Sequence, residues 1–218
     1  MYQLQLTEDE LSPGTGADPL WTQHAIIYAW KGAADINGER LHVDNAVYVE
    51  DQAVIAAGNE GATLWRWEIV PTAQARQRLA GTGVRHSVLK MARRVKMFEL
   101  VPTSNWLFRL DCIKKHQGST GLHSHPGSGI RCMLNGHLRI ASQKGESSDN
   151  GRPGDSWYEE GAYPLVSTAG PGLTATFLRG MVLPPEFEQY AETANWIEGV
   201  PATNAGWHKY LQRVVTLR

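Results

Sequence analysis

The feature that most restricts the fold of this 218-residue chain is an internal duplication. Three segments recur in the same order, at separations of 104, 110 and 113 positions, and such small drifts are typical of loop insertions. The matched positions are Gly32 with Gly136, Tyr48 with Tyr158, and Pro71 with Pro184. Both copies of the last segment also carry an arginine five positions before the proline, Arg66 and Arg179. We therefore expect two copies of one structural unit.

Each copy has the sequence pattern of β structure. Short apolar or alternating runs are separated by turns rich in Gly, Asn, Asp and Pro at intervals of roughly 8 to 12 residues. The runs are Ala25–Trp30, Ala46–Val49, Thr63–Val70, Asn105–Ile113, Ile130–Leu134 and Thr174–Leu183. The pattern predicts an all-β chain with one barrel in residues 1–84 and a second in residues 85–218.

A few short helices are expected in the linker and the C-terminal tail. Thr72–Ala80 has a helical or irregular pattern, and Ser87–Met97 places apolar residues at helical spacing. Helix signals also occur in Glu186–Trp196, and the aromatic residues of Trp207–Tyr210 are expected to pack on a barrel.

Composition excludes several classes of protein. The net charge of −1 and the pI near 6.7 give no electrostatic basis for binding nucleic acid or an anionic membrane. No apolar run approaches the roughly 20 residues of a membrane span, and the first residues do not resemble a signal peptide. Cys112 and Cys132 are too few for a disulfide framework. We expect a soluble cytoplasmic protein with reduced thiols.

Two histidines separated by one residue, His123 and His125, form the most specific motif. In an extended strand, residues i and i+2 point to the same face. Both imidazoles therefore converge on one point inside a β-barrel, which is one way in which proteins hold a divalent metal.

A duplicated β-barrel with an H-x-H strand resembles the cupin superfamily, and specifically a bicupin. His123, His125 and Gly136 match the first cupin motif, and the stretch from Pro153 to Pro164 corresponds to the second. The resemblance implies two jelly-roll barrels and a homodimer.

The chain departs from the cupin pattern at two expected metal ligands. The glutamate of the first motif falls at Gly129, and the histidine of the second motif falls at Pro164. In the N-terminal copy the equivalent ligand positions hold Pro19, Trp21 and Ala25, so the resemblance implies no metal site there.

An arginine stands close to the histidine pair. If Gly129 faces the barrel interior, strand parity turns Arg131 inward and Cys132 outward. In one interpretation, Arg131 binds a substrate carboxylate or phosphate while the histidines hold a metal or act as acid and base. In the other, the metal site is lost and Arg131 belongs to an internal ion pair with Glu159 or Glu160. The sequence leaves both open.

Further residues are candidates for the same site. Glu160 ends the strand of the second motif and is the carboxylate expected to complete a metal site or take part in catalysis, ahead of His116 and His137. Trp157 and Tyr163 are expected to form an aromatic pocket wall, or else part of an ordinary barrel core.

The leading functional hypothesis is a small-molecule site for an anionic compound in the C-terminal barrel. With Fe, Mn, Ni or Zn bound, such a site supports oxygenation, isomerisation or lyase chemistry. The alternative is a metal-free protein that binds or senses a small ligand, or a structural bicupin with a degenerate metal site.

Overall fold

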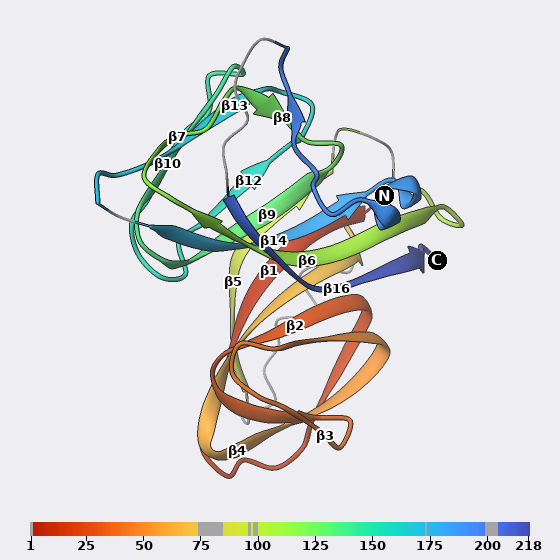
Figure 1. Ribbon diagram of the computed structural model, residues 1–218. Helices are drawn as coiled ribbons and strands as arrows, with labels where there is room; N and C mark the ends of the chain where they lie inside the picture. Colours follow the sequence, from red (N-terminus) through yellow and green to blue (C-terminus); the bar gives the residue numbers. More distant parts are fainter. Residues whose placement is uncertain (1, 74–84, 96, 98–99, 173, 199–204) are drawn as a thin grey trace. The chain divides into compact units, whose positions relative to one another are not determined.

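The computed structural model describes residues 2–73, 85–95, 97, 100–172, 174–198 and 205–218, and these residues are mostly in strands (Figure 1). The all-β class expected from the sequence is confirmed. The chain divides into two compact units. Unit 1 comprises Met1–Val95, Leu100–Ser104 and Leu217–Arg218, and unit 2 comprises Lys96–Glu99 and Asn105–Thr216.

Unit 1 is built on one sheet with the strand order β3-β2-β4-β1-β5. Its strands are β1 (Tyr2–Leu11), β2 (Asp18–Ile36), β3 (Glu39–Leu41), β4 (Ala46–Pro71) and β5 (Arg85–Arg94). The two halves of the long strand β4 both pair with β2, so that Ala25 is opposite Val49 on one side and Glu68 on the other. This double pairing rolls the sheet around its own core.

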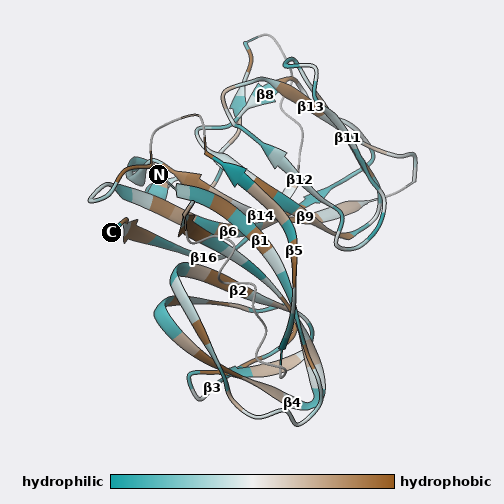
Figure 2. Cartoon of the chain, turned by 180° about the vertical axis from the view of Figure 1, so that it is seen from behind, coloured by the Kyte–Doolittle hydropathy of each residue, from teal (hydrophilic) through white to brown (hydrophobic). Residues whose placement is uncertain are grey.

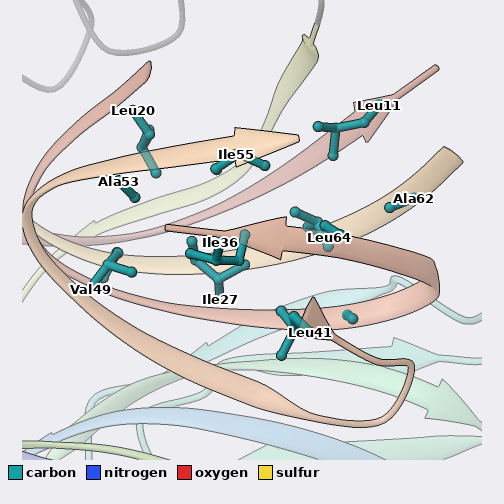
Figure 3. Close-up of a cluster of buried hydrophobic side chains, with 13 residues drawn as sticks. Leu11, Leu20, Ile27, Ile36, Leu41, Val49, Ala53, Ile55, Ala62 and Leu64 are labelled. Atoms are coloured by element: carbon teal, nitrogen blue, oxygen red, sulfur yellow. The ribbon is translucent and has the colours of Figure 1, made fainter. Parts of the chain in front are cut away.

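The core of unit 1 lies inside this rolled sheet. Apolar side chains from β1, β2, β3 and β4 meet there, among them Leu11, Ile27, Leu41 and Leu64 (Figure 3). Hydrophobic and hydrophilic segments alternate along long strands such as β4 (Figure 2). In β4, exposed and buried positions mix in the first half of the strand, whereas residues 64–70 are buried on both faces.

Unit 2 is built from two sheets. One has the order β11-β10-β13-β8-β15, with β7 also paired to β13, and the other has the order β12-β9-β14-β6-β16. The strands are β6 (Asn105–Lys115), β7 (Gly118–Ser119), β8 (His123–Ser124), β9 (Ser128–Asn135), β10 (Leu138–Ser142), β11 (Ser147–Asn150), β12 (Ser156–Glu159), β13 (Leu165–Ala169), β14 (Ala175–Leu183), β15 (Asn195–Trp196) and β16 (Ala205–Thr216). One hydrophobic cluster joins Met133 and Phe177 of the second sheet to Ile140 and Leu165 of the first, so the two sheets pack face to face.

The expected helices are wrong for the part of the chain that the structure describes. Residues 87–94, predicted as helical within Ser87–Met97, belong to strand β5, because β1 offers them a free edge for backbone hydrogen bonds. Glu186–Trp196 contains only part of a 3-10 helix, η2 (Pro185–Gln189), followed by β15. Of Thr72–Ala80, residues 74–80 lie outside the described residues, and Thr72 and Ala73 form a turn.

The aromatic tail packs as expected. Trp207 lies on β16, which pairs with β6, and its side chain contacts the hydrophobic cluster of unit 2.

Pairing of β5 with β1 also places residues 85–94 in unit 1, whereas the sequence assigned them to the C-terminal barrel.

Each unit contains the same buried ion pair. Arg66 binds Asp9 through Nε (2.7 Å) and Nη2 (3.1 Å), and Arg179 binds Asp111 through Nε (2.7 Å) and Nη2 (2.8 Å). Arg66 and Arg179 are the two arginines that the internal duplication matches. Equivalent positions therefore make equivalent contacts in the two units.

The last two residues of the chain belong to unit 1. The Leu217 amide donates to the Ser104 carbonyl (3.0 Å), and the Thr103 amide donates to the Leu217 carbonyl (2.6 Å). Arg218 forms ion pairs with Glu50 (2.7 Å) and Asp51 (3.0 Å). Unit 1 is thus closed by residues from the far end of the sequence.

Among the described residues, no helix has the length and apolar character needed to cross a membrane.

Candidate functional site

A pocket in unit 2 contains both histidines of the H-x-H motif. Its polar lining comes from several strands, with His123 on β8, His125 just beyond it, Glu159 on β12, Arg179 on β14 and Lys115 at the end of β6. The cavity volume is about 50 Å³. The site therefore depends on the closure of the two sheets rather than on any one local segment.

The two histidines have fixed orientations. His123 Nδ1 lies 2.9 Å from the Gly121 carbonyl, and His125 Nδ1 lies 2.9 Å from the Thr193 carbonyl. Because a carbonyl can only accept, each Nδ1 carries a hydrogen. His123 Nε2 then has a free lone pair, whereas His125 Nε2 lies 3.2 Å from a carboxylate oxygen of Glu159, which also can only accept. The rings are 5.1 Å apart and nearly perpendicular, at 81°. The expected convergence of the pair is thus present.

Burial disfavours the charged form of both imidazoles. Burial, and after it the neighbouring His125, lowers the pKa of His123 from 6.5 to about 4. Burial also lowers the pKa of His125, against the opposing effect of Glu159. Neutral histidines can accept a proton or bind a cation.

Glu159 is the centre of the hydrogen-bond network. Its Oε1 accepts a hydrogen bond from Trp157 Nε1 (2.8 Å), and its Oε2 lies 2.7 Å from Arg131 Nη2 and 3.2 Å from His125 Nε2. Burial acts to raise the pKa of the Glu159 carboxyl, but the Arg131 charge and the His125 contact together hold it far below its usual range. Glu159 is therefore a buried, ionised carboxylate.

Arg131 makes the internal ion pair that the sequence offered as one of two interpretations. Its guanidinium is 0 % exposed, with Nη2 on Glu159 and Nη1 donating to the Gly129 carbonyl at 2.6 Å. Cys132, expected to face outward, is also buried. Both faces of β9 are covered at this point.

Several predicted site residues lie away from the pocket. Glu160 forms an ion pair with Lys144 (2.7 Å), and Tyr163 is 43 % exposed. Trp157 does not line the pocket; it packs on Phe177, with ring centres 5.2 Å apart, and donates a hydrogen bond to Glu159. The pocket wall uses other aromatic residues instead, namely Phe177, Trp196 and Trp207.

The two further histidine candidates are also separate from the site. His137 pairs with Asp149 at the surface, and His116 is exposed. Neither contributes to the lining of the pocket.

The sequence did not single out Lys115 and Arg179 as site residues. Arg179 binds Asp111 and stacks over Trp207, with its Cζ 4.4 Å from the ring centre, while its Nη1 makes no hydrogen bond to another described residue. Lys115 donates to the His116 carbonyl (2.8 Å), and burial lowers the pKa of its ammonium group. The only available signal was the match of Arg179 with Arg66.

The donor set does not fit a complete metal centre. In the described part of the chain, no group of three or more His, Cys, Asp and Glu side chains could hold a metal ion. The free Nε2 of His123 is a good metal ligand, but His125 Nε2 lies against the Glu159 carboxylate, and that carboxylate oxygen is already paired with Arg131.

Comparisons with known proteins give the fold. No protein-family model and no curated protein sequence matches the chain. Among solved structures, oxalate decarboxylase from Bacillus subtilis is similar, with a TM-score of 0.53 and 14% identity over 82% of this chain and 68% of that chain. Salicylate 1,2-dioxygenase from Pseudoaminobacter salicylatoxidans, with bound gentisate, gives a TM-score of 0.51 and 10% identity over 81% and 68%. At these identities the likeness concerns the fold, which is of the cupin type.

Proposed function

We propose that this cupin-fold chain binds a small anionic compound in the pocket of unit 2. The observation that carries the proposal is an excess of buried positive charge. The described residues in and behind the pocket include four cations, Lys115, Arg109, Arg131 and Arg179, and two carboxylates, Asp111 and Glu159. An anion in the pocket would balance this excess, since unpaired buried charge is costly.

Lys115 and the free side of Arg179 are the proposed anion-binding groups. Both line the pocket, and no carboxylate among the described residues forms an ion pair with Lys115. A guanidinium held rigidly by Asp111 and Trp207 is pre-organised to bind a carboxylate or phosphate oxygen.

The size of the pocket restricts the ligand. A cavity needs a free volume of roughly 10–15 Å³ to hold one water molecule. The volume of about 50 Å³ therefore fits a compact anion with few heavy atoms, such as a short carboxylate. The neutral His123 and His125 would contact the opposite end of such a ligand and are placed to act as acid and base.

Calorimetric titration with acetate, oxalate, pyruvate and phosphate tests the proposal. At least one of these anions is expected to bind, and Lys115→Met is expected to weaken its binding by about 10-fold or more. The matched control is Lys114→Met, because Lys114 precedes Lys115 on β6 and is exposed. Equal binding by both variants, or binding of none of the anions, would contradict the proposal.

The second candidate is a divalent-metal-dependent oxygenase, isomerase or lyase that uses Fe, Mn, Ni or Zn. It is favoured by two imidazoles that backbone carbonyls hold through Nδ1 and whose ring centres lie 5.1 Å apart. In that case His123 and His125 would hold the metal, which would supply Lewis-acid or redox chemistry. Elemental analysis of protein purified without chelators, compared with His123→Ala, tests this function. Substoichiometric metal that the substitution leaves unchanged would refute it.

We also propose that the two units are copies of one barrel, as in a bicupin, and that the chain forms a homodimer. The matched ion pairs of Arg66 and Arg179 support the duplication. Light scattering coupled to size-exclusion chromatography tests the dimer, and a mass near 24.1 kDa would refute it.

A further inference from the structure

We propose that the guanidinium of Arg131 replaces a divalent cation, so that this site is built to work without a metal. The inference goes beyond anion binding, because it concerns what neutralises the carboxylate of the site and not which ligand enters. Three structural observations support it.

The first observation is that the missing carboxylate has moved to the neighbouring strand. Gly129 of β9 occupies the sequence position where the cupin pattern has a glutamate, and its direct partner across the strand pair is Glu159 of β12. The Glu159 carboxylate reaches His125 Nε2 at 3.2 Å. A carboxylate is therefore present beside the histidines, although it comes from a different residue.

The second observation is that Gly129 and Arg131 occupy one space. A Cβ added at Gly129 would lie 2.7 Å from Arg131 Nη1 and 2.7 Å from the Gly180 carbonyl oxygen. A glutamate at position 129 is thus incompatible with the observed position of the guanidinium. The guanidinium and the Gly180 backbone together therefore fill the space that a side chain at position 129 would need.

The third observation is that Arg131 and His125 approach the same oxygen atom. Glu159 Oε2 lies 2.7 Å from Arg131 Nη2, and the guanidinium is held from its other side by the Gly129 carbonyl. The charge of the carboxylate is therefore already balanced. A dication bound by the histidines would lie next to a fixed and buried positive charge, and the two charges would repel each other.

The test is metal binding by chelator-treated protein, measured by calorimetry with Zn²⁺, Mn²⁺ and Co²⁺ and by elemental analysis. The wild type is expected to bind none of these ions at the histidine pair. Arg131→Met removes the positive charge and keeps a long side chain, so we expect the affinity for at least one ion to rise by about 100-fold or more. Adding His125→Ala to this variant should abolish the gain.

Two controls make the result specific. Arg131→Lys keeps the charge and should gain no metal affinity, and Arg139→Met removes an arginine that is 70 % exposed and pairs with Asp149. Circular dichroism reports whether each variant folds. If Arg131→Met does not fold, metal binding by the wild type alone decides whether the histidine pair holds a metal.

Two outcomes would overturn the inference. One is a wild type that binds one equivalent of metal and loses it on His123→Ala. The other is a folded Arg131→Met that gains no metal affinity. Anion titrations of the wild type are independent of both outcomes, so failure of the anion site and failure of this inference can be told apart.

Discussion

Replacing Glu159 with glutamine removes one charge from the centre of the site and hardly changes the volume of the side chain. The carboxylate accepts a hydrogen bond from Trp157 through one oxygen and forms an ion pair with the Arg131 guanidinium through the other. A glutamine has only one acceptor oxygen, so its NH₂ group must face one of these two donors. Arg131, which is fully buried, also loses its counter-charge.

We expect Glu159→Gln to reduce the free energy of unfolding by about 3–5 kcal/mol, the usual cost of removing one partner of a buried ion pair. Urea denaturation followed by tryptophan fluorescence measures this cost, since Trp157 contacts the substituted residue. The matched control is Glu160→Gln. Its partner Lys144 lies near the surface, where solvent screens the ion pair, so this substitution is expected to cost far less.

The wild type should also lose this stabilisation in acid. Because the pKa of Glu159 is depressed in the folded state, its contribution is complete above the ordinary carboxyl pKa of 4.5. It is lost progressively as the pH falls below that value toward the depressed pKa. A cost for Glu159→Gln that equals the cost for Glu160→Gln at pH 7 would refute the reasoning.

Three further predictions concern pH, ion pairs and packing. Burial lowers the pKa of His123 from 6.5 to about 4, so as the pH falls the unfolded chain takes up this proton at a higher pH than the folded chain does. The free energy of unfolding should therefore fall by about 2 kcal/mol between pH 7 and pH 5 through this residue. Urea titrations of His123→Gln should not show this loss. Arg66→Met and Arg179→Met should each cost about 3–5 kcal/mol in the same assay, and a cost below about 1 kcal/mol would contradict the buried pairs. Gly129→Ala should cost about 1–3 kcal/mol because its Cβ meets backbone, with a lower melting temperature. Gly16→Ala, where a Cβ meets nothing, is the control and should melt like the wild type.

The position of the site could be predicted from the sequence because it depends on local periodicity. The spacing of His123 and His125 placed both rings on one side of the chain, and the structure brings them within 5.1 Å. Strand parity turned Arg131 inward, and its ion pair with Glu159 was one of the two interpretations. These properties need only the alternation of side chains along a strand.

The acidic residue was harder to predict, since Glu159 and Glu160 are neighbours that point to different surroundings. Strand β12 ends at Glu159, and its buried positions are Trp157 and Glu159. Which glutamate meets the histidines depends on the pairing of β12 with β9, opposite Gly129. This register is a long-range property that no local pattern in the sequence records.

The strand β5 shows a different limit. Its apolar residues have helical spacing, and Val88 and Leu89 are nevertheless exposed on a strand. Pairing with the edge of β1 satisfies the backbone hydrogen bonds of this segment. This tertiary contact outweighs the helical spacing of its apolar residues.

Because of the contacts of Leu217 and Arg218, unit 1 is not completed in the order in which the chain is translated. A ribosome makes unit 1 first, yet the partners of Ser104, Glu50 and Asp51 are translated only after the whole of unit 2. Domains usually fold in the order in which they emerge during translation. Here unit 1 can form its contacts with Leu217 and Arg218 only after unit 2 has been translated, so the nascent unit 1 lacks these contacts until translation has passed through its neighbour.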